Sequence, residues 1–137
     1  MNPSEGIRVG IDLAEVSAVA DSIERFGDRY LTRIYTPHEL DCARVGDSFD
    51  PSTLAARFAA KEATIKVLAP SGAQPPWRCI EVRRSASGAC AIALHEGAAE
   101  MAKREGITAL AVSMTHESNL AASVVVATTG PSHRAPR

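Results

Sequence analysis

Apolar and polar residues alternate along the chain with the two periods of regular secondary structure. Apolar or alternating runs predict strands over residues 7–12, 77–85, 89–94, 108–117 and 119–128. Apolar residues three and four positions apart predict helices over residues 14–26, 36–45, 51–68 and 95–106. Turns are expected at Ser87-Gly88 and near residues 117–119. We therefore expect an α+β fold with a largely antiparallel sheet and a long central helix.

The central helix carries two charges close to its predicted buried face. At 100° per residue, that face consists of Leu54, Phe58, Ile65 and Leu68. Lys61 lies within this apolar stripe, and Glu62 lies at its edge. Because an unpaired buried charge is costly, each of these side chains needs a partner, a metal or a wet cleft.

Two further segments have clear start and stop signals. Thr36 is expected to be a helix N-cap, with Pro37 at the first helical position and Glu39 completing a capping box. Residues 44–53 and 69–76 are rich in Gly, Pro, Asp and Ser, so we expect loops on both sides of the central helix.

The chain has 137 residues, which is enough for one domain with a substantial core and too few for two. We assign residues 1–130 to this domain and expect the Pro-, Ser- and Arg-rich residues 131–137 to form a disordered tail. Hydrophobic residues make up 45% and charged residues 23% of the chain, a balance that is typical of globular proteins.

Charge and cysteine content narrow the class of protein further. A formal net charge of −1 includes no basic excess, which argues against nucleic-acid binding. We see no signal-peptide pattern, and apolar runs such as residues 121–127 are too short to span a bilayer. Cys42, Cys79 and Cys90 lack C-x-x-C spacing and are expected to be free thiols. The expected location is the cytoplasm, with no membrane attachment.

Two places in the chain carry charged side chains that are candidate functional residues: the end of the first strand and the central helix. Asp12 ends a strand that is otherwise apolar, and such a residue is often a plain helix cap. Glu62 and Lys66 are spaced i, i+4, which is common for a surface pair contributing only about 0.3–0.5 kcal/mol. Against that interpretation, Glu62 lies next to the apolar stripe. By themselves, the residues indicate only carboxylates and lysines that share one cleft.

His116 belongs to a third polar group, the segment 113–117 at the end of a strand. A lone histidine at a turn is usually structural, and no second His or Cys is spaced as a zinc site requires. The chain also lacks the glycine-rich loops of Rossmann and P-loop proteins.

Three segments match, in order, the motifs of holo-acyl-carrier-protein synthases. They are GIDLAEV (10–16), RFAAKEATIKVL (57–68) and SMTHE (113–117). The chain therefore resembles the short type of 4′-phosphopantetheinyl transferase, from about Ile7 to Thr128. This resemblance implies that it moves phosphopantetheine from coenzyme A to a serine of an apo acyl carrier protein, with Mg²⁺, and releases adenosine 3′,5′-bisphosphate.

The resemblance also assigns roles to individual residues. Asp12 and Glu62 match the metal-binding carboxylates, and together with Lys66 they form the expected catalytic group. Lys66, His116 and Arg57 are expected to bind coenzyme A, through its phosphates in the case of Lys66 and His116. The general base is left open between Glu62 and a water on the metal.

Members of the family are typically homotrimers with active sites between subunits, and their first helix docks the acidic carrier protein. Arg25, Arg29 and Arg33 follow one another at intervals of four and are the expected carrier-binding residues. The alternative for this basic stripe is an ordinary solvated helix face. Ala18 and Ser22 depart from the family, which often carries a basic and a larger apolar residue there.

Three other functions are compatible with these residues. The chain could be a catalytically silent relative that binds coenzyme A or a carrier protein. It could be a structural trimer or adaptor, which predicts no magnesium-dependent nucleotide binding. It could also be a magnesium enzyme that acts on a different pyrophosphate substrate.

Overall fold

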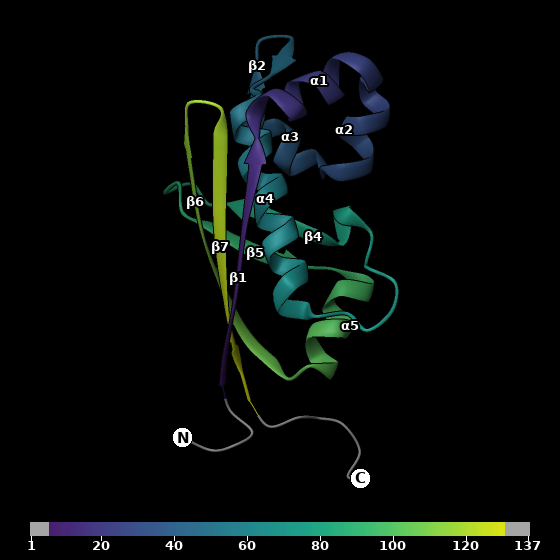
Figure 1. The fold of residues 1–137 in the computed structure, drawn as a ribbon, viewed down its shortest axis with the longest axis vertical. Coiled ribbons are helices and arrows are strands. Elements are labelled where there is room, and N and C mark those ends of the chain that lie inside the picture. The colour runs from purple at the N-terminus through teal and green to yellow at the C-terminus, as the bar shows by residue number, and fades with distance from the viewer. Residues whose placement is uncertain (1–5, 131–137) are drawn as a thin grey trace.

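A computed structural model describes residues 6–130, and the expected tail at 131–137 lies outside the described residues. A three-stranded sheet, a long helix beside it and a smaller hairpin form the framework (Figure 1). The strands are β1 (Gly6–Glu15), β2 (Arg44–Val45), β3 (Ser48–Phe49), β4 (Ile80–Arg84), β5 (Cys90–Leu94), β6 (Ile107–Glu117) and β7 (Leu120–Thr129). The helices are α1 (Val16–Phe26), α2 (Asp28–Ile34), α3 (Pro37–Ala43), α4 (Pro51–Leu68), the 3₁₀-helix η1 (Trp77–Cys79) and α5 (Glu96–Arg104).

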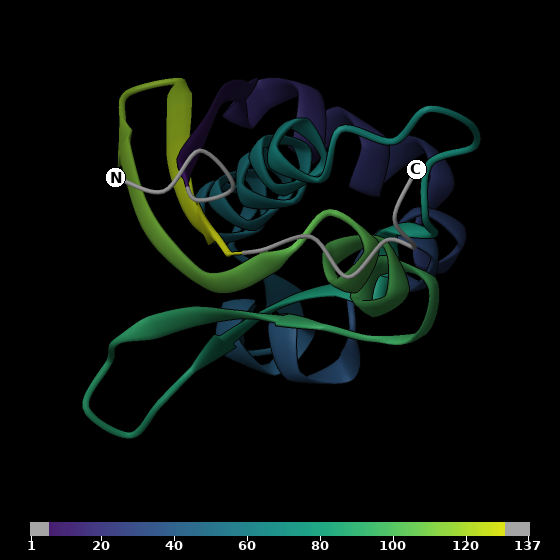
Figure 2. The same ribbon diagram turned by 90° about the horizontal axis from the view of Figure 1, so that it is seen from below.

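The main sheet has the order β1-β7-β6, and all of its pairs are antiparallel. The strands β4 and β5 form a separate antiparallel hairpin. Figure 2 shows α4 with the main sheet on one side and the β4–β5 hairpin in another layer. This arrangement confirms the α+β class, the antiparallel pairing and the central helix.

One face of the sheet packs on α4, and the other is apolar and open. Side chains in β1 alternate, so that Arg8, Gly10 and Asp12 face inward while the intervening residues face outward. The outward residues have exposed fractions between 61% and 67%: Ile7, Val9, Ile11 and Leu13. This row of four side chains, called the β1 apolar row below, is unusual for a protein surface.

The helix α4 is buried around most of its circumference, so the expectation of a single apolar stripe was wrong. Leu54, Ile65 and Leu68 are buried as expected, but Phe58 is only half-buried. Five small side chains, which allow neighbouring elements to approach closely, are also buried: Ala55, Ala56, Ala59, Ala60 and Ala63. The helix therefore contacts the sheet on one side and β4 and α3 on another.

Gly10 is the position where β1 lies closest to α4. A Cβ atom built at Gly10 would lie 2.1 Å from the carbonyl oxygen of Ala63 and 3.2 Å from Cβ of Lys66. A glycine is therefore required for the strand to rest directly on the helix. The close approach brings Asp12, two residues later in β1, towards the middle of α4.

Three local expectations were wrong and several were confirmed. The strand expected from Trp77 begins only at Ile80, because Trp77–Cys79 form the 3₁₀-helix η1. Residues 44–53, expected as a loop, contain the small β2–β3 hairpin, whose turn uses Gly46 at φ 58°. The first helix begins two residues later than expected and ends at Phe26, because Gly27 adopts φ 54° and starts α2. The capping box of Thr36 and Glu39 is present, as are both predicted hairpin turns.

Candidate functional site

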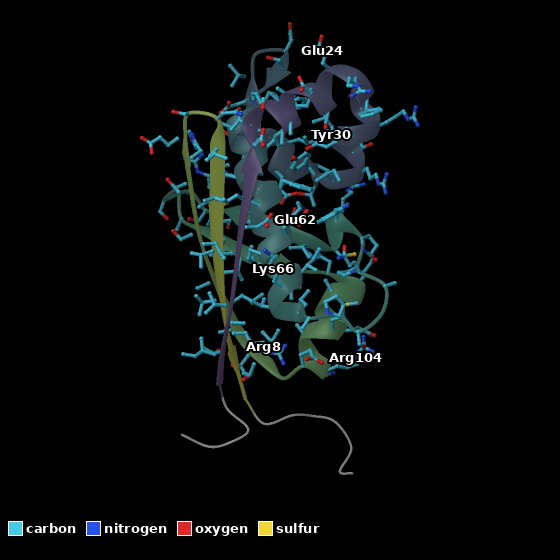
Figure 3. All side chains as sticks on the ribbon, in the orientation of Figure 1. Arg8, Glu24, Tyr30, Glu62, Lys66 and Arg104 are labelled. Carbon is cyan, nitrogen blue, oxygen red and sulfur yellow. The ribbon has the colours of Figure 1, made fainter. Side chains whose placement is uncertain are left out.

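Asp12, Glu62 and Lys66 come together where β1 crosses α4. Asp12 faces inward from β1, while Glu62 and Lys66 lie one turn apart on α4. The Lys66 ammonium lies 3.2 Å from Oδ1 of Asp12 and donates to the backbone oxygen of Ile11 at 2.7 Å. Figure 3 shows Tyr30, Glu62 and Lys66 in succession along the long axis of the molecule. The structure therefore unites the three residues expected to form the catalytic group.

The surroundings of Glu62 disfavour its negative charge. Burial raises the pKa of the Glu62 carboxyl, the charge of Asp12 raises it further, and Lys66 acts in the opposite direction. Within residues 6–130, no hydrogen-bond donor contacts Glu62. A half-buried carboxylate beside a second carboxylate is stabilised by an added cation.

These two carboxylates fit a magnesium ion better than a transition metal. Magnesium typically takes one or two protein carboxylates and completes its octahedron with phosphate oxygens and waters. In the part of the chain that the structure describes, no group of three or more His, Cys, Asp or Glu side chains is placed to hold a metal. The site would therefore need the oxygens of a substrate and of water.

A cleft of about 380 Å³ extends from this pair. Asp12 and Glu62 line one part of it, and Ser22 and Tyr30 line another. The remaining wall is mainly apolar or small: Leu13, Ala14, Glu15, Ala18, Val19 and Phe58. Tyr30 was missed in the sequence, because its distance of eighteen residues from Asp12 gives no local signal.

Of the residues expected to bind coenzyme A, only Lys66 is next to the carboxylates. Arg57 and His116 do not line the cleft. Arg57 has an exposed fraction of 8%, its Nε has no hydrogen-bond partner among the described residues, and its Nη2 lies 4.0 Å from Sγ of Cys90. His116 is exposed on β6, opposite Ala121 of β7.

The three arginines expected to bind the carrier protein lie on two helices. Arg25 is in α1, and Arg29 and Arg33 are in α2 beyond the break at Gly27, so one continuous stripe was a wrong expectation. Arg29 and Arg33 line a second hollow of about 420 Å³ with Phe26, Ile34, Ser22 and Tyr30. Arg25 lies outside this basic hollow, with its guanidinium 5.6 Å from the centre of the Phe26 ring.

Lys61 is structural, although it precedes Glu62. Its side chain is fully buried, and its ammonium lies 2.8 Å from Oε1 of Glu39. It also donates to the backbone oxygens of Trp77, at 3.1 Å, and Ile80. Burial lowers the pKa of Lys61 and the charge of Glu39 opposes that shift. The capping-box position of Glu39 was visible in the sequence, but its partner in another helix was not.

A hollow of about 490 Å³, larger than the cleft, lies elsewhere in the molecule. It is bounded by the loop after α4 and by Met101, Arg104 and Glu105. Its only carboxylate, Glu105, pairs with Arg8 at 3.0 Å. It therefore offers no pair of carboxylates for a metal, and we place the candidate site at Asp12 and Glu62.

Known proteins resemble this chain in both sequence and structure. Residues 8–125 match the 4′-phosphopantetheinyl transferase superfamily. The holo-[acyl-carrier-protein] synthase of Desulforudis audaxviator is 38% identical over 124 residues, which cover 90% of this chain and 93% of that protein. The crystal structure of Helicobacter pylori holo-[acyl-carrier-protein] synthase in complex with coenzyme A is similar, with a TM-score of 0.75, 27% identity and coverage of 88% and 99%. The Chronobacterium ammoniagenes synthase–coenzyme A complex has a TM-score of 0.76 at 26% identity, with coverage of 91% and 98%.

Proposed function

This chain belongs to the 4′-phosphopantetheinyl transferase superfamily and is an enzyme of the holo-acyl-carrier-protein synthase type, and we propose how its residues carry out the transfer. The proposed reaction moves 4′-phosphopantetheine from coenzyme A to a serine hydroxyl of an apo acyl carrier protein. The serine oxygen forms a bond to phosphorus as the bond to adenosine 3′,5′-bisphosphate breaks, and the serine proton leaves with a base.

The observation that carries this proposal is the meeting of Asp12, Glu62 and Lys66 at one cleft. The two carboxylates would hold Mg²⁺, which neutralises charge on the pyrophosphate when it is bound. Lys66 is one turn from Glu62 and half-exposed, so its ammonium is available to a phosphate of coenzyme A. Binding a phosphate there would replace its present contact with Asp12.

The basic hollow beside the cleft is the proposed docking place of the carrier protein. Arg29 and Arg33 supply positive charge, and Phe26 and Ile34 supply apolar surface. Arg25 adds charge next to Phe26. An acidic carrier protein would be oriented by these charges, with its serine directed towards the neighbouring cleft.

We further propose that the chain works as a homotrimer, with each active site completed by a second subunit. The β1 apolar row lies on the open face of the main sheet, which suits contact with another copy of the chain. Arg57 and His116, which do not line the cleft of the single chain, would act on coenzyme A in the assembled trimer. The buried Arg57 guanidinium, which has no carboxylate partner among the described residues, is suited to an anionic ligand.

The proposed compartment is the cytoplasm. The cysteines Cys42, Cys79 and Cys90 are free thiols, which is typical of a reducing environment. No helix within residues 6–130 has both the length and the apolar character needed to cross a membrane.

The test is to incubate the protein with Mg²⁺, coenzyme A and an apo acyl carrier protein, and to weigh the carrier by intact mass spectrometry. We expect a gain of one phosphopantetheine that is abolished by a chelator, by Asp12→Ala and by Glu62→Gln. Glu100→Gln, which removes an exposed charge on α5, is the matched control and should retain the activity. Full activity of Asp12→Ala would contradict the assignment of the site. Coenzyme A binding without transfer to several carriers would favour a silent relative.

A further inference from the structure

Two side chains that carry a hydroxyl lie between the cleft lined by Asp12 and Glu62 and the basic hollow. Ser22 of α1 and Tyr30 of α2 line both of these spaces. Among the described residues, no other is common to the two lining sets. The Ser22 hydroxyl donates to the backbone oxygen of Ala18 at 2.9 Å, which leaves its oxygen able to accept a hydrogen bond.

Tyr30 is held from behind by a second tyrosine. Its Oη lies 2.7 Å from Oη of Tyr35, and the two rings pack edge to face with their centres 5.7 Å apart. Tyr35 is fully buried, and its Oη lies 3.3 Å from the backbone oxygen of Leu54 in α4. A chain of hydroxyl groups therefore connects the boundary of the cleft to the helix that carries Glu62.

The hydrogen bonds of this pair leave the Tyr30 hydroxyl with either a spare acceptor or a spare donor for a ligand. When Tyr35 donates to Leu54, Tyr30 donates to Tyr35 and offers its oxygen as an acceptor. When Tyr35 instead donates to Tyr30, the hydroxyl proton of Tyr30 is free for a ligand. Burial raises the pKa of both tyrosines, so that each stays neutral and acts as a hydrogen-bonding group.

The wall of the cleft combines three kinds of surface. Two carboxylates form the proposed metal site, apolar side chains such as Val19 and Phe58 form much of the wall, and Ser22 and Tyr30 contribute side chains that carry a hydroxyl. The pantetheine arm of coenzyme A has a matching sequence: a phosphate, a branched hydrocarbon, and then a hydroxyl and two amides. Because the arm is bonded to the phosphorus that reacts, it must extend outward from the proposed metal site.

We propose that Tyr30 is a substrate-positioning residue, whose hydroxyl forms a hydrogen bond with an amide of the pantetheine arm. This inference rests on the proposed phosphopantetheinyl transfer and deepens it by assigning the arm to this cleft. The apolar wall takes the hydrocarbon part of the arm, and the Tyr30–Tyr35 pair takes the polar part. The carrier protein then occupies the basic hollow on the other side of the same tyrosine.

The test compares Tyr30→Phe with the unmodified protein on two donors. One donor is coenzyme A, and the other is an analogue in which a plain alkyl chain replaces the amide-bearing arm. We expect Tyr30→Phe to lower kcat/KM for coenzyme A about three- to tenfold, the usual effect of one neutral hydrogen bond. The KM for the carrier protein and the rate with the alkyl donor should not change.

Thr32→Ala is the matched control, because Thr32 is on the same helix and, within residues 6–130, its hydroxyl bonds only to the backbone of Asp28, at 2.7 Å. It should leave all of these constants unchanged. Equal loss with both donors, a raised KM for the carrier protein, or no effect of Tyr30→Phe would each overturn the inference. Failure of the unmodified protein to use coenzyme A would instead contradict the proposed function.

Discussion

Lys61 and Glu62 are adjacent in α4, yet their side chains have different surroundings. Lys61 points into the core, where Glu39 and two backbone oxygens accept all three of its ammonium protons. Glu62 points to the cleft, where burial and Asp12 disfavour its charge. One turn of helix therefore contains a satisfied charge that stabilises the fold and an unsatisfied charge that is available to a ligand.

Glu62→Gln should stabilise the protein when metal is absent. The pKa of Glu62 is raised in the folded state, so the folded protein binds more protons than the unfolded chain as the carboxyl titrates. The contribution of Glu62 to stability is therefore complete at low pH and is lost as pH rises through its folded pKa. Thermal melts with a chelator should show a higher Tm for Glu62→Gln at pH 7 and a vanishing difference near pH 4.

Added Mg²⁺ should reverse that order, because ligand binding to the folded state stabilises it. We expect Mg²⁺ to raise the Tm of the unmodified protein and to leave Glu62→Gln unchanged. Equal Mg²⁺ shifts in both proteins would place the metal elsewhere.

Lys61→Met should destabilise the fold by about 3–5 kcal/mol, because it leaves Glu39 buried without its counter-charge. Urea unfolding measures this loss. The double variant Lys61→Met with Glu39→Gln should recover part of it, since a neutral side chain can still accept from the backbone of Thr36 or Val82. An additive loss in the double variant would show that the two side chains act independently.

At the scale of elements, the site depends on how closely β1 rests on α4. Gly10 allows the strand to contact the backbone of Ala63, and this contact sets the separation between Asp12 and the two α4 residues of the site. The helices α1 and α2 then close the cleft, since both contribute to its wall. The proposed metal ligands are on β1 and the long helix α4, and the proposed substrate contacts are on the two short helices.

Gly10→Ala should therefore impair both folding and activity. The new Cβ would lie 2.1 Å from a backbone oxygen that cannot rotate away, so β1 must move off the helix. We expect a loss of about 1–3 kcal/mol in urea unfolding, the usual cost of overpacking, and a larger fractional loss of transferase activity. Gly72→Ala, where a Cβ meets no atom within 4 Å, is the control. Unchanged activity in Gly10→Ala would show that the site does not depend on this contact between β1 and α4.

Most elements could be predicted from the sequence because their signals are local. The periods of apolar residues gave the main strands and helices, and Thr36 and Pro37 gave the start of α3. The contacts between distant elements could not be predicted in this way. The motif resemblance indicated that Asp12, Glu62 and Lys66 belong together, and their geometry became visible only when β1 was seen lying on α4.

The alanines of α4 explain why the buried part of this helix was predicted to be a single stripe. A helix with one apolar stripe packs on one neighbour, whereas small residues around Ala55 and Ala60 let several elements approach. Similarly, one basic stripe was expected across Gly27, because a spacing of four residues does not show that a helix ends between them. Tyr30, which lines the cleft, is on α2 beyond the break at Gly27.

At the scale of the whole molecule, the main sheet has one face on α4 and one open face. The β1 apolar row places four large side chains on that open face, where they gain nothing from the core of a single chain. A contact with other copies would bury them, and it would bring further side chains to the cleft of each subunit. Assembly and catalysis are therefore expected to depend on the same face of the sheet.

Val9→Lys should break this assembly, because it places a charge in the middle of the β1 apolar row. Val45→Lys is the matched control, since Val9 and Val45 are both 62% exposed and Val45 lies on β2 instead. Light scattering after gel filtration should give three chains for the unmodified protein and for Val45→Lys, and one chain for Val9→Lys. Transferase activity should fall only in Val9→Lys. A single-chain mass for the unmodified protein would contradict the proposed trimer.

The open apolar face also has a consequence for how the enzyme responds to dilution. If each site is shared between subunits, the rate per chain depends on how much protein is present and falls steeply below the concentration at which subunits separate. A fixed amount of enzyme would then lose activity when it is diluted and recover it when it is concentrated. In a cell, the number of copies made would set not only how many sites exist but whether any of them is complete.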